Sequence, residues 1–307
     1  MKIPIITGYT SSGKTALSLA IADFLDIEII SADAFQVYRG MDIGTGKPDK
    51  DELLKVRHHM IDILNPDEQY SAGDFFEMAE DLIDQIIKRG KIPLIVGGTG
   101  LYVETLINGI FAGPEKNNEF RIEMAKDIGK KGIEYFYKLL MEKDPIYAQK
   151  ISHNDINKII RAFEIIYYTK MTVTDAHRIL HRTPKYKYSL YLIDKDRENL
   201  YKSINQRVEK MFASGWVDEV KYLLMNGYKE TMSSFKAIGY REIANFIKNG
   251  GNLEETISDI QKKTRNFAKR QITWFKHMND LNKLTMDKLN IKQFSIELLR
   301  QIDPENS

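Results

Sequence analysis

Short apolar runs alternate with amphipathic segments along the N-terminal part of the chain. Three runs have the length and composition of buried strands: Lys2–Thr7, Ile27–Ser31 and Ile92–Val96. Between them, Thr15–Leu25 and Phe75–Lys88 carry apolar residues at the spacing of a helix face. Strands that alternate with helices predict a parallel sheet covered by helices, which is an α/β fold.

The alternation stops in the middle of the chain, where one helical pattern follows another. These patterns cover Phe120–Ile128, Ile133–Lys143, Asp155–Thr169 and Thr172–Leu180. A further strand is predicted at Tyr188–Ile193, and the remaining patterns are helical again, over Arg197–Met211, Val217–Asn226 and Leu253–Met278. We therefore expect a core formed by residues 1–114 and 188–307, interrupted by a helical insertion at 115–187.

The composition is that of a soluble globular protein. Of 307 residues, 43% are hydrophobic and 29% are charged, which excludes a disordered chain. No run approaches the roughly 20 apolar residues of a membrane span, and no signal peptide pattern precedes the first strand. We expect a cytoplasmic protein that does not contact a membrane. The absence of cysteine excludes disulfides, thiolate zinc sites and cysteine nucleophiles.

The formal net charge of +2 is distributed unevenly along the chain. Residues 1–114 carry −7, residues 115–187 carry +5 and residues 188–307 carry +4. A basic surface for an anionic partner would therefore lie beyond residue 114. An ordinary solvated helical surface explains the excess in the insertion equally well.

A phosphate-binding loop follows the first predicted strand. The segment GYTSSGKT at 8–15 matches G-x-x-x-x-G-K-[ST] and opens a predicted helix, as the motif requires. Backbone N–H groups of such a loop face an anion, Lys14 meets the anionic oxygens, and Thr15 can ligate Mg²⁺. The motif predicts a ligand with a diphosphate group. It leaves open whether ATP can occupy the loop and whether diphosphate is a leaving group.

Two further loops follow predicted strands and should converge on the same crevice. Asp33 comes directly after the second strand, and Thr99 lies in the glycine-flanked segment after the third. Asp33 could hold Mg²⁺, as in a nucleotide kinase, act as a general base, or cap a helix. Thr99 offers a hydroxyl group beside a backbone that a planar ligand can approach closely.

Histidines and aromatic residues have simpler interpretations. His58 and His59 point to opposite faces of an extended chain, so we expect structural or hydrogen-bonding roles rather than a metal site. The aromatic residues of the insertion are expected in its core rather than as platforms for bases: Tyr135, Phe136, Tyr137, Tyr167 and Tyr168.

The last long predicted helix is basic. Its cations are Lys262, Lys263, Arg265, Lys269, Arg270 and Lys276, interleaved with Phe267, Trp274 and Phe275. Positions 262, 265, 269 and 276 lie near one face, which suits either contacts with successive phosphates or a solvated face.

Taken together, these segments resemble the tRNA dimethylallyltransferase family, also called tRNA isopentenyltransferases. The resemblance extends over almost the whole chain. It rests on GYTSSGKT at 8–15, ISADAFQVYRGMDIGTGKP at 30–48, HHMIDI at 58–63, GGTGLY at 97–102, RAFEI at 161–165, KAIGYRE at 236–242 and KRQITWF at 269–275. The fold that it implies is a P-loop NTPase-like parallel sheet with a helical insertion domain.

The resemblance implies transfer of a dimethylallyl group from dimethylallyl diphosphate to N6 of the adenosine on the 3′ side of the tRNA anticodon, position 37. Asp33 would be the general base, and Thr99 would orient the target nucleotide. The diphosphate would be held by Gly8, Thr10, Ser11, Ser12, Gly13, Lys14 and Thr15 with Mg²⁺, which Thr15 ligates. The positions that match tRNA contacts are Asp33, Ala34, Phe35, Gln36, Thr99, Arg121, Asn157, Lys158, Ile159, Ile160 and Arg161.

The chain departs from the family pattern at several of these positions. The loop usually reads G-P-T-A-S-G-K-T, whereas Tyr9 and Ser11 stand here. The pair Ala34-Phe35 replaces Ser-Met, and Asn157-Lys158 replaces Gln-Arg. Ser203 stands where arginine is expected, which leaves Arg207 as the candidate for binding the diphosphate, or as a solvated surface arginine.

Three other functions stay open at this point. A P-loop kinase would turn over ATP, an enzyme that prenylates free AMP would need no large basic surface, and a non-catalytic RNA-binding module would not need a phosphate loop. We expect the partners to be the anticodon stem-loop and dimethylallyl diphosphate, and we expect the protein to be a monomer.

Overall fold

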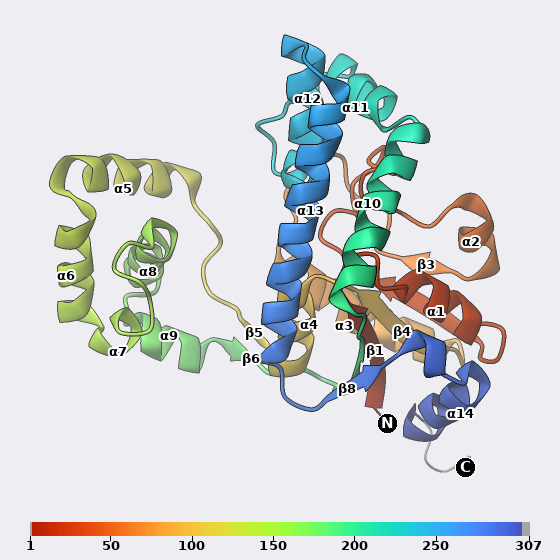
Figure 1. Cartoon of the computed structure of the whole chain (residues 1–307). Coiled ribbons are helices and arrows are strands. Elements are labelled where there is room, and N and C mark those ends of the chain that lie inside the picture. Colours follow the sequence, from red (N-terminus) through yellow and green to blue (C-terminus); the bar gives the residue numbers. More distant parts are fainter. Residues whose placement is uncertain (1, 303–307) are drawn as a thin grey trace. The chain divides into compact units, whose positions relative to one another are not determined.

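Residues 2–302 are described by the structure, which is a computed structural model. They form two compact units (Figure 1). The first comprises the chain up to Ile107 and from Pro184 onward, and the second is Asn108–Thr183. No helix in the described part of the chain is long and apolar enough to cross a membrane.

A six-stranded parallel sheet forms the centre of the first unit. Its order is β3-β2-β4-β1-β7-β8. The strands are β1 (Lys2–Gly8), β2 (Ile27–Ser31), β3 (His58–His59), β4 (Ile92–Gly97), β7 (Lys187–Ile193) and β8 (Leu281–Leu284). β1 lies between β4 and β7, with Ile5 opposite both Ile95 and Leu190. The predicted α/β class is therefore confirmed, and the four predicted strands are present.

Helices cover the sheet because the apolar residues of its strands alternate between two faces. Tyr191 and Ile193 pack with Leu17 of α1 (Lys14–Ile21) and Phe294 of α14 (Ile291–Ile302). Leu192 points the other way, toward α10 (Arg197–Ala213) and α13 (Leu253–Lys276). α10 and α13 lie side by side in Figure 1.

The other helical elements of this unit follow the chain. They are α2 (Lys50–Lys55), α3 (Ala72–Lys88), α4 (Gly100–Asn108), α11 (Trp216–Met225), α12 (Tyr240–Asn249) and the 3-10 turns Ser234–Lys236 and Met286–Lys288. α3 begins at a capping box in which Ser71 and Asp74 exchange hydrogen bonds. α11 and α12 enclose a core around Trp216 and Tyr240. The same core includes Val37, Tyr38 and Met41 from the segment that follows β2.

The second unit is helical, as predicted. It contains α5 (Asn118–Lys131), α6 (Ile133–Lys143), α7 (Pro145–Ala148), α8 (Ile156–Thr169) and α9 (Val173–Ile179). Its core is built around Phe136, Leu140, Ile159 and Ile165. A two-stranded antiparallel pair, β5 (Ile110–Phe111) with β6 (His181–Arg182), joins its two ends.

Both boundaries of the insertion lie earlier in the chain than the expected 115 and 187. The β5–β6 pair places residues from 108 onward in the insertion, and strands of two residues leave no periodic signal in a sequence. At the other end, Lys185 already belongs to the core. Its N–H donates to Glu80 on α3 at 2.6 Å, and its ammonium group pairs with Asp84.

Candidate active site

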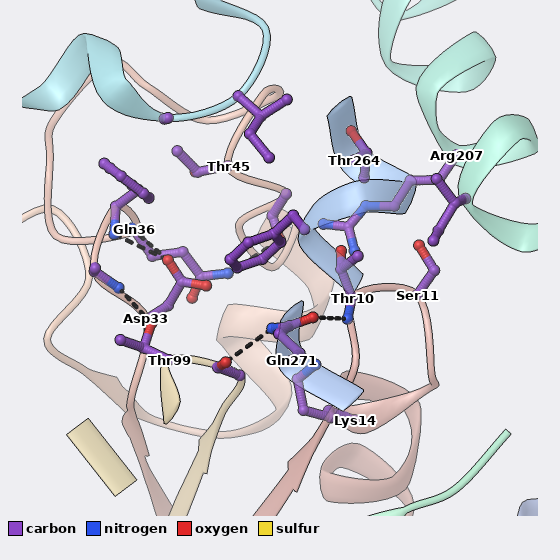
Figure 2. A pocket seen from close by; sticks show the side chains of 18 of the residues that line it. Thr10, Ser11, Lys14, Asp33, Gln36, Thr45, Thr99, Arg207, Thr264 and Gln271 are labelled. Atoms are coloured by element: carbon purple, nitrogen blue, oxygen red, sulfur yellow. Dashed lines mark hydrogen bonds between the residues drawn. The ribbon is translucent and has the colours of Figure 1, made fainter. Parts of the chain in front are cut away.

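A cavity of about 750 Å³ lies at the carboxyl ends of β1, β2 and β4 (Figure 2). Three loops line it, at residues 10–16, 33–36 and 98–101. Side chains of α10 and α13 and Trp216 of α11, together with residues 44–46 and 236–238, complete the lining. The strand-end loops that the sequence predicted to converge therefore meet at one site, as the ends of parallel strands do.

The phosphate loop contains two serine hydroxyls, those of Ser11 and Ser12, that make no hydrogen bond within the described part of the chain. Gly13 has a φ of 106°, which favours glycine, and Ser11 also has a positive φ of 63°. The N–H of Ser12 donates to Tyr9 O at 3.1 Å, which closes the turn. Within residues 2–302, the buried Oγ atoms of Ser11 and Ser12 have no hydrogen-bond partner. Buried polar atoms are rarely left unsatisfied, so these oxygens fit the binding of a polar ligand.

Lys14 is held against the loop backbone. Its Nζ donates to the carbonyl oxygens of Gly8 and Tyr9, at 2.9 Å each. Burial, and then the positive charge of Arg207, lower the pKa of Lys14 to about 8, while the carboxylate of Asp33 acts in the opposite direction. Gly8 does not line the cavity, so its part in the loop is to position Lys14. A ligand with several negative charges would relieve the repulsion between the two cations.

Arg207 lies at the cavity and not on the outer surface. It projects from α10 into the lining, as Figure 2 shows. A Cβ atom on Gly46 would stand only 1.8 Å from Arg207 Nη2, so a glycine at position 46 makes room for the guanidinium group. Burial lowers the pKa of Arg207, and the Asp33 carboxylate opposes that effect. Ser203, at the position where the family has arginine, instead accepts a hydrogen bond from Lys195 at 2.7 Å.

Asp33 is fixed by one of its two carboxylate oxygens. Asp33 Oδ1 accepts from the N–H groups of Phe35 at 2.9 Å and Gln36 at 3.3 Å. In the described chain, Oδ2 has no hydrogen-bond partner. Thr99 Oγ1 accepts from Ala34 N–H at 3.1 Å, so Thr99 supports the loop that carries Asp33. A carboxylate held at one oxygen and open at the other is suited to accept a proton.

The residues after Asp33 line the same cavity. Gln36 accepts from Ser31 Oγ at 2.8 Å and donates to Gly46 O at 3.2 Å, so its amide links the loop after β2 to the segment that supports Arg207. Ala34 and Phe35 also belong to the lining. Thr10 and Thr15 do as well, and no hydrogen bond engages the Thr15 hydroxyl in the described part of the chain.

Gln271 is a site residue that the sequence analysis did not single out. It lies on α13 and is buried, and its Oε1 accepts from Thr10 N–H at 2.9 Å while its Nε2 donates to Gly98 O at 2.8 Å (Figure 2). The side chain thus ties the phosphate loop to the loop that carries Thr99. The only signal in the sequence was its place within the segment KRQITWF at 269–275.

The basic residues of α13 do not share one environment. Arg265 donates to Asn205 on α10 at 2.6 Å, and Lys263 pairs with Glu242 and Asp259. Lys262, Lys269, Arg270 and Lys276 are exposed, and Arg270 also lines the cavity. Of the four cations predicted near one face, Lys262, Lys269 and Lys276 are therefore exposed, and Arg265 is engaged with α10.

The two arginines of the insertion meet at one buried carboxylate. Glu164 is completely buried and accepts from Arg121 Nε and Nη2 at 2.9 and 2.7 Å, and from Arg161 Nη1 at 2.6 Å. Arg161 also donates to Pro114 O at 2.8 Å. Burial alone would raise the pKa of Glu164, but the hydrogen bonds from Arg121 and Arg161 lower it to about 2. Both arginines therefore stabilise the fold of the insertion, and their contact with tRNA stays a prediction.

Two of the residues expected to contact tRNA are core residues. Ile159 and Ile160 are 0% and 7% exposed and belong to the core of the insertion, so their side chains are not available to RNA. They lie on the buried face of α8 because apolar residues recur there at helical spacing. Asn157 and Lys158, in the first turn of the same helix, are exposed.

The prediction that the aromatic residues of the insertion form its core is only partly right. Phe136 is buried, but Tyr135, Tyr167 and Tyr168 are 49%, 56% and 43% exposed. Tyr167 and Tyr168 flank Phe120, with ring centroids 5.3 and 5.9 Å from it. The buried residues of α6 and α8, such as Phe136, Leu140, Ile159 and Ile165, occupy one face of each helix, and Tyr135, Tyr167 and Tyr168 lie outside these faces, so part of this cluster stays at the surface.

Arg161→Ala is expected to destabilise the insertion by about 2–4 kcal/mol, because it removes one partner of a buried ion pair. Arg178 offers a matched control, since it forms an exposed ion pair with Asp175 at the same spacing. Arg178→Ala should cost less than about 1 kcal/mol. The free energy of unfolding is measured by urea unfolding followed by circular dichroism. If Arg161→Ala and Arg178→Ala lower it equally, a structural role for Arg161 is contradicted.

The histidine pair has the structural role that was expected. His59 Nε2 lies 2.6 Å from Oε2 of the buried Glu28, which also accepts from Arg89, and His58 Nδ1 lies 2.8 Å from Val56 O. Burial would raise the pKa of Glu28, but the hydrogen bonds from Arg89 and His59 lower it to about 2. No cluster of histidine and acidic residues within residues 2–302 could hold a metal ion.

The site defines a class of protein: a phosphate-loop fold in which two partly buried cations and a carboxylate face one cavity. Such a cavity can hold a diphosphate next to a group that accepts a proton.

Comparison with known proteins identifies the family. The model of the family described as "IPP transferase" matches residues 36–278. A tRNA dimethylallyltransferase of Acetivibrio thermocellus is 38% identical over 299 residues, which cover 96% of this chain and 95% of that protein. One from Thermodesulfovibrio yellowstonii is 40% identical over 286 residues, covering 91% and 90%.

Solved structures agree with this assignment. The tRNA isopentenylpyrophosphate transferase of Bacillus halodurans has a TM-score of 0.71 and 35% identity, with 99% of this chain and 96% of that chain covered. A eukaryotic dimethylallyltransferase acting on tRNA has a TM-score of 0.83 and 26% identity, with 98% and 79% covered. The chain belongs to the IPP transferase family and is a prenyltransferase.

Proposed function

We propose that the protein transfers a dimethylallyl group from dimethylallyl diphosphate to N6 of adenosine 37 in tRNA and releases diphosphate. The observation that supports this is the arrangement of charges in one cavity. Figure 2 shows Asp33 and Gln36 on one side of the pocket and Ser11 and Arg207 on the other. An anionic leaving group and a proton-releasing acceptor can therefore occupy the same cavity at different sides.

The phosphate loop would bind the diphosphate of the donor. When the bond between C1 of the allyl group and the diphosphate oxygen breaks, negative charge grows on the diphosphate. Lys14, Arg207 and the hydroxyls of Ser11 and Ser12 stabilise this charge more strongly than the charge of the intact donor. The hydrogen bonds from Lys14 to the carbonyl oxygens of Gly8 and Tyr9 hold this cation at the loop, which reduces the cost of reorganisation.

Asp33 would act on the acceptor. The adenine N6 is a weak nucleophile because its lone pair is conjugated with the ring. As the bond from N6 to C1 forms, a proton leaves N6, and Asp33 Oδ2 can accept it because only Oδ1 is engaged by the backbone. Thr99 acts as a positioning residue through its hydrogen bond with Ala34 N–H, and its hydroxyl can also meet the nucleotide.

The residues around the loop fit a Mg²⁺ ion bound mainly through the diphosphate. Mg²⁺ in phosphate sites keeps several waters and takes few protein ligands. The Thr15 hydroxyl lines the cavity and is not engaged by any described residue, so Thr15 would hold the ion. When bound, Mg²⁺ would neutralise part of the charge of the leaving group.

The acceptor is proposed to be tRNA rather than a free nucleotide. A mononucleotide needs neither an insertion with a net charge of +5 over residues 115–187 nor the exposed cations of α13. Membership of the IPP transferase family argues against a kinase.

One experiment separates these functions. The protein is incubated with radiolabelled dimethylallyl diphosphate, Mg²⁺ and either bulk tRNA or AMP. We expect label in tRNA, at an N6-dimethylallyladenosine that nuclease digestion and chromatography identify, without any need for ATP. Label in AMP instead would contradict the choice of acceptor, and release of ADP from ATP during modification would support the kinase.

The affinity for tRNA is expected to fall steeply with salt, because lysines and arginines of the insertion and α13 displace counterions from the phosphates. The slope of log affinity against log salt should be about −0.7 to −0.9 for each phosphate contact. Binding of dimethylallyl diphosphate should depend on salt far less. Equal slopes for both substrates, measured by filter binding, would argue against an extended RNA surface.

A further inference from the structure

Trp274 differs from the other tryptophan of the chain in its exposure. The chain has two tryptophans; Trp216 is 1% exposed, whereas Trp274 is 42% exposed although both line the cavity. Leu101 and Arg270 also line the cavity and are exposed. Residues that line a cavity and also face solvent lie at its opening, so Trp274, Leu101 and Arg270 form the mouth of the site.

The indole of Trp274 is supported on one face. A Cβ atom on Gly100 would stand 2.6, 2.7 and 2.9 Å from Cδ1, Nε1 and Cγ of Trp274. Similar distances to three contiguous ring atoms place that point over the ring face and not at its edge. The first turn of α4 therefore supports one face of the indole because residue 100 is glycine. Because Trp274 is 42% exposed, part of the indole that Gly100 does not cover is accessible to solvent.

Two exposed cations lie close to Trp274 along α13. Lys269 and Arg270 are exposed on the same helix, one turn before Trp274. The Arg270 guanidinium lies over the ring of Phe267, 5.7 Å from its centroid. An aromatic face flanked by cations is the combination that binds single-stranded nucleic acid, in which bases stack on rings and phosphates meet lysine or arginine.

We propose that the Trp274 indole is a stacking platform for a base that flanks the target adenosine. This proposal rests on the proposed function. A target adenine that enters the cavity leaves its neighbours in the anticodon loop, and the neighbouring bases lose a stacking partner. The platform at the mouth replaces that partner and so lowers the cost of extracting the base.

The test measures binding of a fluorescently labelled anticodon stem-loop RNA that carries adenosine 37. Two further RNAs have an abasic nucleotide on the 5′ or the 3′ side of that adenosine. The variants are Trp274→Leu, which keeps apolar volume without a ring, and Trp274→Phe, which keeps a ring. Tyr222→Leu is the matched control, because Tyr222 is a 64% exposed aromatic residue on α11 that does not line the cavity.

We expect Trp274→Leu to weaken binding of the intact RNA about 10-fold, within the range for loss of one base–aromatic stack, and Trp274→Phe to weaken it less. For the wild-type protein, one of the two abasic RNAs should bind more weakly than the intact RNA, by the same factor that Trp274→Leu causes with the intact RNA. The Trp274→Leu variant should then bind this abasic RNA no more weakly than the wild-type protein does. The KM of the Trp274 variants for dimethylallyl diphosphate should stay near the wild-type value. The Tyr222→Leu variant should bind the RNA as tightly as the wild-type protein.

If the losses of RNA affinity caused by Trp274→Leu and by each abasic nucleotide are additive, the platform is overturned. Unchanged RNA binding by Trp274→Leu would overturn it as well. A rise in the KM for dimethylallyl diphosphate alone would instead assign Trp274 to the donor. A wild-type protein that neither binds nor prenylates the intact RNA would overturn the proposed function and the platform with it. Effects confined to Trp274 variants leave the proposed function intact.

Discussion

Asp33→Asn is expected to lower the turnover of dimethylallyl transfer by about 100-fold or more, the effect typical of a positioned general base, while the affinity for dimethylallyl diphosphate should stay close to that of the wild type. Asparagine keeps the Oδ1 acceptor that the N–H groups of Phe35 and Gln36 need, so the loop after β2 retains its conformation. It removes the ability of the side chain to take a proton from N6. Single-turnover kinetics and equilibrium donor binding measure the two quantities separately.

Asp33→Ala serves as the companion variant, because it removes the acceptor for both N–H groups as well as the base. If its thermal melt stays close to that of Asp33→Asn, the shared loss of turnover reports chemistry rather than a disturbed loop. The opposite pattern, in which turnover is retained and donor binding is lost, would make Asp33 a ligand of the metal ion and not the base.

Lys14→Met is expected to lower kcat/KM by about 100-fold or more, as does removal of one preorganised group from a site that stabilises developing charge. The same ammonium group meets the diphosphate in the ground state and after the bond to C1 breaks, so both KM and kcat should change. Methionine keeps most of the volume of the side chain, and thermal melts check that the loop is still folded.

The affinity for the donor should also depend on pH through Lys14. The pKa of Lys14 in the free protein is lowered to about 8, and a bound diphosphate raises it because the charged form gains a partner. Affinity should therefore be full below about pH 8 and fall by up to about tenfold per pH unit above it. The Lys14→Met variant should show a flat profile over this range. A wild-type profile that is equally flat would mean that Lys14 does not meet the diphosphate.

The strands and most long helices of the fold could be predicted from the sequence because their signals are local. The predicted range Ile27–Ser31 is β2 itself, and Ile133–Lys143 is α6. The pair β5–β6 and strand β8 could not be predicted, since two to four residues carry no measurable period. α12 and α14 were also missed, although both have a clear apolar face.

The three strand-end loops of the site could be predicted from the topology of the sheet. Asp33, Thr99 and the phosphate loop each follow a strand, and the parallel topology brings strand ends together. Gln271 was missed because it reaches the loop from α13, 261 residues along the chain from its partner Thr10. Arg207 had two equally good interpretations until Gly46 was seen to make room for it.

By itself, then, the sequence determined the phosphate loop, the α/β core and the family, because these depend on residues that are neighbours along the chain. Only the tertiary structure decided which side chains are available for chemistry. It showed that Arg121 and Arg161 are both paired with Glu164, and that Trp216 is buried while Trp274 is open at the cavity. Burial and pairing depend on contacts between residues far apart in the chain, and a local pattern carries no information about them.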